Sequence, residues 1–114
     1  MAGKALDLDA VRRIAMALAG VEEHAMHGAP SWKTRGKLLA SPAIHKSAEP
    51  HSLMVRISPA DRSQLLAADP ETYYLTDHYR SHCVVLVRLA KTDWDSLENL
   101  LHRAWLFVRS SSKR

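Results

Sequence analysis

The stretch around Gly36 constrains the fold of this chain more than any other. Lys33, Arg35 and Lys37 are spaced two residues apart around this glycine. Side chains two apart project from the same face of a strand, so Lys33 and Arg35 should share one face, with Trp32 on the other. Gly36 adopts positive φ without steric cost, as a tight connection requires. We therefore expect an edge hairpin with a basic outer face.

Length and composition place the chain among single-domain globular proteins. Its 114 residues, 46% hydrophobic and 25% charged, suit one domain with one core. We expect that domain to span 1–114, with an ordered core over about 9–109 and a flexible tail over 110–114. No apolar run approaches the roughly 18 residues that cross a bilayer. The first residues lack the apolar segment of a signal peptide, so we expect a cytoplasmic protein without membrane association.

Charge and cysteine content narrow the classes of partner. A formal net charge of +4 favours anionic partners. The single cysteine, Cys83, forms no internal disulfide or cysteine-rich metal site. Since Cys83 opens an apolar run, we expect a thiol packed in the core.

Three segments have the spacing of helices. The first begins after Asp9, a suitable N-cap, and ends near Gly20. The second begins at Pro59 and stops at Asp69, which precedes another proline. The third begins at Thr92 and has the strongest apolar stripe in the chain.

Five segments are expected to be strands, with short connections that favour antiparallel pairing. Residues 21–31 are expected to be an irregular connection, because Gly28 and Pro30 interrupt any period. The strands are two from the hairpin between Ser31 and about Ser41, then Ser52–Ser58, Tyr73–His78 and Cys83–Ala90. The order predicts an α+β fold, a two-layer sandwich α-β(3)-α-β(2)-α with a five-stranded antiparallel sheet and helices on one face.

The sheet face without helices is the candidate binding surface. Cations together with aromatic rings are typical of nucleic-acid-binding sheets, but an ordinary solvated sheet has the same composition. Val84 and Leu86 on this face would instead favour self-association. The residues expected on it are Lys33, Arg35, Met54, Arg56, Tyr74, Thr76, His78, Val84, Leu86 and Arg88.

No pattern in the sequence indicates an enzyme, a cofactor or a metal site. Asp77 and His78 are neighbours in an expected strand, where they would point to opposite faces and could not act as in a triad. His24 and His27 lack a third ligand at a recognisable spacing. The four glycines are scattered and form no phosphate-binding loop.

Two long segments resemble the MmcQ/YjbR-like family. They are GVEEHAMHGAPSWKTRGKLLA and DPETYYLTDHYRSHCVVLVRLAKTDWDSLENLLHRAW, within a match over about residues 10–108. The resemblance implies a YjbR-like, CyaY-like fold with DNA binding through basic hairpin wings. Ser81 and His82 replace a turn that usually contains glycine in the family.

Carried onto this chain, the resemblance places one wing at the first hairpin and the other at the turn near Arg80. Each cation would neutralise a phosphate of double-stranded DNA, with little sequence preference because no recognition helix is evident. The alternative is a protein-interaction or homodimerising domain, a monomer or weak homodimer in solution. The predicted nucleic-acid contacts are Lys33, Arg35, Lys37, Arg56, Arg80 and Arg88.

Overall fold

Helices and an antiparallel sheet are formed by residues 6–111, the part of the chain that the structure, a computed structural model, describes. The elements are α1 (Leu8–Met16), β1 (Val21–Met26), β2 (Ala29–Thr34), β3 (Lys37–Pro42), β4 (Ser52–Arg56), α2 (Pro59–Ala68), β5 (Tyr73–Tyr74), α3 (Asp77–Arg80), β6 (Val84–Arg88), the 3-10 turn η1 (Leu89–Lys91) and α4 (Trp94–Ser111). None of these helices has the length and apolarity needed to cross a bilayer.

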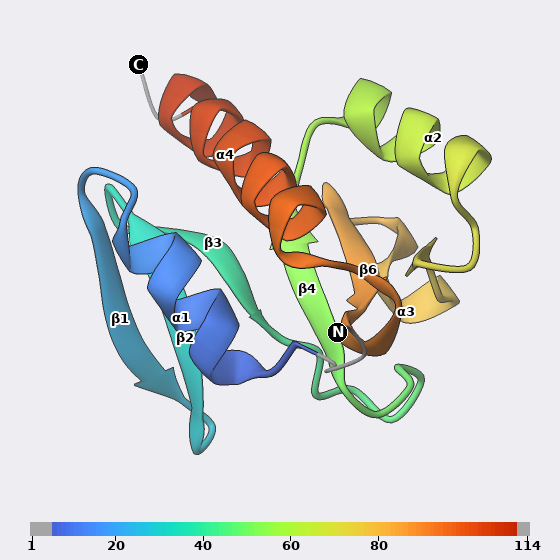
Figure 1. Ribbon diagram of the computed structural model, residues 1–114, viewed down its shortest axis with the longest axis horizontal. Helices are drawn as coiled ribbons and strands as arrows, with labels where there is room; N and C mark the ends of the chain where they lie inside the picture. Colours follow the sequence, from blue (N-terminus) through green and yellow to red (C-terminus); the bar gives the residue numbers. More distant parts are fainter. Residues whose placement is uncertain (1–5, 112–114) are drawn as a thin grey trace.

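The six strands form one antiparallel sheet in the order β1-β2-β3-β4-β6-β5. In Figure 1, α4 crosses this sheet diagonally, and α1 lies beside α4. The predicted α+β class and antiparallel pairing are confirmed. The sheet has six strands where five were predicted.

The additional strand is β1, which lies at an edge of the sheet. It pairs with β2 from Val21↔Thr34 to Met26↔Ala29. Only Val21 is buried, because an edge strand covers little of the core and its other positions tolerate polar residues. The prediction of an irregular connection over residues 21–31 was therefore wrong. His27 and Gly28, both at positive φ (54° and 78°), form the turn between β1 and β2.

The helix starts differ from the predicted ones by up to two residues. Asp7, and not Asp9, caps α1, since its Oδ1 accepts from the Ala10 N–H at 3.0 Å. Asp93, and not Thr92, occupies the same position before α4, accepting from the Ser96 N–H at 2.8 Å. Because α4 continues to Ser111, the predicted tail is helical at 110–111, and its residues 112–114 lie outside the described part.

The segment predicted as a strand over Tyr73–His78 is split. Only Tyr73 and Tyr74 pair with β6, and α3 follows where a turn and a basic wing were expected. Asp77 stands in the first turn of α3, where a carboxylate favours the helix. Cys83 precedes β6 and is exposed, so the prediction of a packed thiol was wrong.

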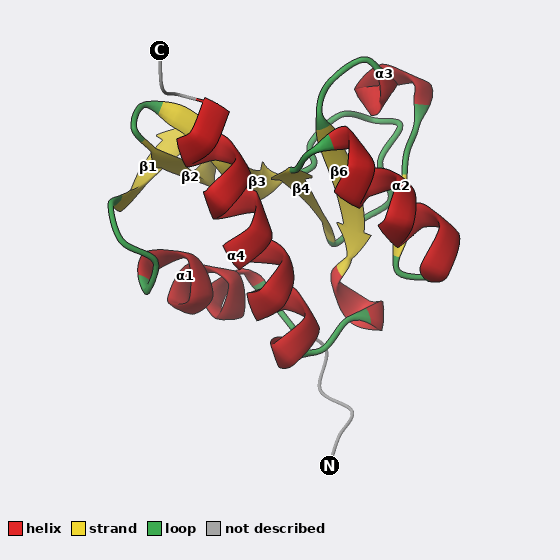
Figure 2. Cartoon of the chain, turned by 90° about the horizontal axis from the view of Figure 1, so that it is seen from above, coloured by secondary structure: helices red, strands yellow, loops and turns green. Residues whose placement is uncertain are grey.

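The main core lies between the sheet and the helices. Figure 2 shows α1 and α4 together on one side of β2, β3 and β4. Leu65 and Leu66 of α2 pack on the same core. Its largest fully buried side chains are Trp32, Leu39, Leu53, Ile57, Leu97, Leu101, Val11, Val55, Val85, Val87 and Val108.

Trp32 joins this core to a polar contact at the edge of the sheet. Its ring is fully buried, and its Nε1 donates to Glu23 Oε1 at 3.0 Å. Arg12 of α1 donates to both oxygens of Glu23, at 2.7 Å and 3.1 Å. These hydrogen bonds, chiefly the one from Arg12, lower the pKa of Glu23 below its ordinary value. One carboxylate thus ties β1 to β2 and to α1.

The other sheet face is open over β1 to β3 and covered beyond them. Residues 43–51, which we call the flap, lie with α3 over β4, β6 and β5, where Tyr79, Val84 and Leu86 form a second cluster. Val84 and Leu86 are only 5% and 0% exposed. They are therefore unavailable as a dimer surface, which overturns the observation behind the self-association alternative.

Candidate nucleic-acid interface

The β2–β3 hairpin is formed by a two-residue turn at Arg35 and Gly36. Both have positive φ, 56° and 77°, as a type I′ turn requires. Arg35 occupies a conformation that is uncommon for a residue with a Cβ. The hairpin was predicted from the sequence, but its predicted position at the edge of the sheet was wrong, because β1 pairs with β2 on the outside. Arg35 also stands in the turn and not in the strand.

This placement separates the three cations of the hairpin. Lys33 pairs with Leu38 on the face away from α4, whereas Lys37 pairs with Thr34, whose side chain is buried on the α4 side. Arg35 lies at the tip. The prediction that Lys33 and Arg35 share a face was therefore wrong, and the cations instead surround the tip on different sides.

Arg56 of β4 adds a partly buried cation on the sheet face that lies opposite α4. It pairs with Val84, on the same face as Lys33. Two strand spacings separate β2 from β4, which is about 10 Å laterally. The Nε of Arg56 is buried and has no hydrogen-bond partner within the described structure. Arg56 is thus a cation with an unused donor near the hairpin.

Ion pairs with carboxylates do not neutralise these four cations within the described residues. Within residues 6–111, none of Lys33, Arg35, Lys37 and Arg56 has an ion pair to a carboxylate within 4.0 Å. Glu22 pairs in register with Lys33, but its Oε1 lies 3.2 Å from His24 Nε2. The end of the sheet at the hairpin is therefore positively charged.

Arg80 is less suited to a wing than predicted. It ends the short helix α3, and its Nε lies 3.5 Å from Asp77 Oδ1. Both side chains are well exposed, so this pair is weak. Arg80 remains a cation on the surface, but no hairpin presents it.

Arg88 is occupied within the fold. It donates to both oxygens of Glu49 at 2.8 Å and 2.7 Å, and to the carbonyls of Pro70 and Glu71 at 3.2 Å and 2.9 Å. Its guanidinium also lies over the Tyr74 ring, 4.2 Å from the centroid. The hydrogen bonds from Arg88 lower the pKa of Glu49. Arg88 therefore fixes the flap to the sheet, and we leave it out of the interface.

The end of α4 supports the base of the hairpin. Arg109 Nη1 donates to Thr34 Oγ1 at 3.1 Å and to the Ala19 carbonyl at 3.3 Å. Trp105 Nε1 donates to the same carbonyl at 2.8 Å, and Arg109 lies over its ring. No local sequence pattern predicts this contact, because Arg109 is separated from Thr34 by 75 positions. Figure 1 shows the end of α4 beside the hairpin turn.

Gly20→Ala should destabilise the protein by about 1–2 kcal/mol, the usual cost of a left-handed backbone for a residue with a Cβ. Gly20 has φ +75°, and a Cβ there would lie 2.9 Å from Arg109 Nη1. Urea denaturation followed by circular dichroism measures the change. Gly28→Ala, with φ +78° and no atom within 4 Å of the added Cβ, is the control for the backbone cost alone. If Gly20→Ala cost no more than Gly28→Ala, the approach of Arg109 would add no strain.

A groove on the open face lies between the β1–β2 turn and the flap. We call it the open-face groove. It encloses about 420 Å³. The rings of His45 and His78 stack in its wall, 3.5 Å apart and 8° from parallel. Burial, and then the charges of His78 and Lys46, lower the pKa of His45. The lining residues are Met26, His27, Ala29, Pro30, Ser41, Pro42, Ile44, His45, Met54, His78 and Tyr79.

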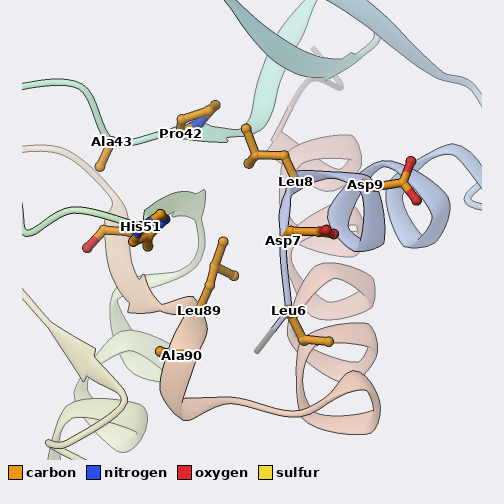
Figure 3. A pocket seen from close by; sticks show the side chains of 10 residues that line it. Leu6, Asp7, Leu8, Asp9, Pro42, Ala43, His51, Leu89 and Ala90 are labelled. Atoms are coloured by element: carbon orange, nitrogen blue, oxygen red, sulfur yellow. The ribbon is translucent and has the colours of Figure 1, made fainter. Parts of the chain in front are cut away.

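A second cavity, of about 670 Å³, lies between the segment entering α1 and the ends of β3 and β6. In Figure 3, Leu8 and Leu89 extend toward this space, while the Asp9 carboxylate points away. Asp7 is engaged as the α1 cap, and Asp9 lies 3.5 Å from both Arg12 and Arg13. The described residues that line this cavity include no lysine or arginine, so it offers a phosphate no cation.

No group of three or more His, Cys, Asp or Glu side chains in residues 6–111 has a geometry that would hold a metal ion. His24 lies in β1 beside Glu22, while His27 lies in the following turn.

Comparison with known proteins identifies the family. Residues 16–107 match the family model described as YjbR. The chain is 35% identical over 112 residues to uncharacterised proteins of Mycobacterium tuberculosis H37Rv and Mycobacterium bovis, covering 86% of this chain and 84% of each relative. The crystal structure of a Deinococcus radiodurans protein with a DUF419 domain superposes with a TM-score of 0.77 at 19% identity, covering 95% of this chain and 82% of that one. The fold is therefore shared with that structure, and the chain belongs to the YjbR family.

Proposed function

We propose that this protein binds double-stranded DNA through the phosphate backbone, using Lys33, Arg35 and Lys37 of the β2–β3 hairpin together with Arg56. The observation that carries the proposal is that Lys33, Arg35 and Lys37 surround the tip of this hairpin, with Arg56 two strands from Lys33. None of the four cations has a carboxylate partner within residues 6–111. Lysine and arginine at such a surface release counterions from DNA when they approach its phosphates. Arg80 extends the interface at its margin.

Binding of this kind has little sequence specificity. Base reading in the major groove usually needs an exposed helix or strand pair with side chains that reach base edges. The longest helix, α4, uses Leu97, Leu101 and Ala104 in the core, where all three are fully buried. The cations of the hairpin diverge around its tip, an arrangement that suits separate phosphates better than one base pair.

Salt dependence tests the proposal directly. Each phosphate contact contributes about −0.9 to the slope of log K against log salt, so four contacts give roughly −3.6. Arg35→Gln should bring the slope about 0.9 closer to zero, because one contact is lost. Fluorescence anisotropy with a labelled duplex at 50–200 mM salt measures both slopes.

Lys91→Gln is the matched control for Arg35→Gln. It removes the same charge from η1, at the opposite end of β6 from the residue that pairs with Arg56. Its slope should stay that of the unmodified protein. A slope close to zero for the unmodified protein, or no binding at 50 mM salt with micromolar protein, would contradict the proposed function.

A further inference from the structure

The open-face groove has a lining suited to a flat ring. Met54 forms part of its floor, half-buried, and Ile44 at its rim is 59% exposed. His45 and His78 supply stacked imidazoles, and the Tyr79 ring meets the His78 ring edge-on at 4.8 Å. Apolar side chains with aromatic rings are what proteins use to hold unpaired bases, since every base has a face that stacks. The volume of about 420 Å³ falls within the range of ligand pockets.

Two cations lie on the same sheet face as this groove, on the side toward the hairpin, although neither of them lines it. Arg56 follows Met54 by two residues on the same face of β4, a distance of about 6.7 Å along a strand. Lys33 lies on the same face two strands away. The buried Nε of Arg56 has no hydrogen-bond partner within residues 6–111, so its hydrogen-bonding capacity is unused within the fold. A ligand acceptor reaches this atom only when the Arg56 side chain moves.

From this arrangement we infer that the open-face groove binds an unpaired nucleotide, with its base against His45, His78 and Met54 and its phosphate on Arg56 and Lys33. The inference rests on the proposed function in that Lys33 and Arg56 serve both. It goes further by naming the ligand as a base joined to a phosphate. The second cavity does not compete for it, because no lysine or arginine is among the described residues that line that space. A free nucleotide and an unpaired nucleotide within a DNA strand offer the same chemistry, so the test contains both.

The test compares three DNA probes and one mononucleotide. The probes are a 12-residue thymidine strand, a 12-residue abasic strand with the same phosphates, and a 12-base-pair duplex, beside adenosine monophosphate. The thymidine strand should bind about 5- to 150-fold more tightly than the abasic strand, which is the range of one base stacked on aromatic side chains. Amide chemical shifts should move at Ala29, Ser41 and His78 with the thymidine strand or the mononucleotide.

His78→Ala should remove most of the difference between the thymidine and abasic strands and leave duplex binding unchanged. His78 is exposed, so the variant should fold. The matched control is His102→Ala, which removes an exposed imidazole stacked on Trp105 of α4, far from the groove. A second pair is Ile44→Asp with Leu106→Asp as control, since these side chains are similarly exposed at 59% and 51%. Ile44→Asp should weaken nucleotide binding by repelling the phosphate.

The outcomes separate this inference from the proposed function. Equal affinity for the thymidine and abasic strands, with groove amides unmoved by the mononucleotide, would overturn the groove as a base site and leave duplex binding standing. Duplex binding that fails while the thymidine strand binds and responds to His78→Ala would overturn the proposed function and support the groove. Binding of the mononucleotide alone would support the groove and assign it to free nucleotides.

Discussion

A variant in which Lys33, Arg35 and Lys37 are all changed to glutamine should lose several hundred-fold in affinity for double-stranded DNA at 0.1 M salt. The binding constant varies with salt to the power of about −0.9 for each contact, so one contact is worth about 8-fold at this concentration. Three contacts therefore amount to about 500-fold. The residues lie in and beside the turn, outside the core, so folding should be unaffected. Fluorescence anisotropy with a duplex gives the affinity, and circular dichroism verifies the fold.

The control for this variant removes three charges elsewhere. Lys46→Gln, Lys91→Gln and Arg103→Gln lie in the flap, in η1 and on α4, away from the hairpin. Combined, they lower the net charge by the same amount. The proposed interface attributes the loss of affinity to the position of the charges in the hairpin and not to the net charge of the protein. This control should therefore change the affinity for the duplex by only a few-fold. An equal loss in both triple variants would mean that net charge alone drives binding, and the hairpin interface would be wrong.

Trp32→Ala should lower the free energy of unfolding by about 3–5 kcal/mol, the usual cost of removing a buried aromatic side chain. Trp32 is fully buried between the sheet and the helices, and its Nε1 also donates to Glu23. The substitution leaves a cavity and removes one of the links between β1 and β2. Urea denaturation followed by circular dichroism measures the change without depending on tryptophan fluorescence.

The matched control is Trp94→Ala, at the start of α4. Trp94 is 38% exposed, so its loss should cost less than about 1.5 kcal/mol. A cost for Trp32→Ala no greater than that for Trp94→Ala would contradict the position assigned to Trp32 in the core.

The faces of the inner strands could be predicted from the sequence because burial imposes a strict alternation there. Leu53 and Val55 were expected on one face of β4, with Met54 and Arg56 on the other, and the register with β6 confirms this. β1 was not predicted from the sequence, because its residues show no alternation of apolar and polar side chains. The start of α1 was ambiguous, since Asp7 and Asp9 are equally suitable caps and only the hydrogen bond to Ala10 separates them.

The charged residues were harder to place than the apolar ones. A shift of one residue in the turn moved Arg35 out of the strand and sent Lys37 to the face opposite Lys33. Arg88 was expected to face solvent, but Glu49 pairs with it from 39 positions away. No local pattern encodes such a contact, because it depends on where the flap returns to the sheet. The positions of cations along the hairpin were thus predictable, whereas their directions and partners needed coordinates.

The polar character of β1 has a consequence for the behaviour of the protein at high concentration. A strand at the border of a sheet offers unpaired N–H and C=O groups to any neighbouring chain, and charged side chains there discourage intermolecular strand pairing. The side chains of Glu22 and His24 are exposed to solvent, as are those of most other residues of this strand. These side chains therefore protect the native protein from sheet-mediated aggregation. Substituting valine at both positions would lower the solubility of the protein, although the strand would then be easier to predict from the sequence.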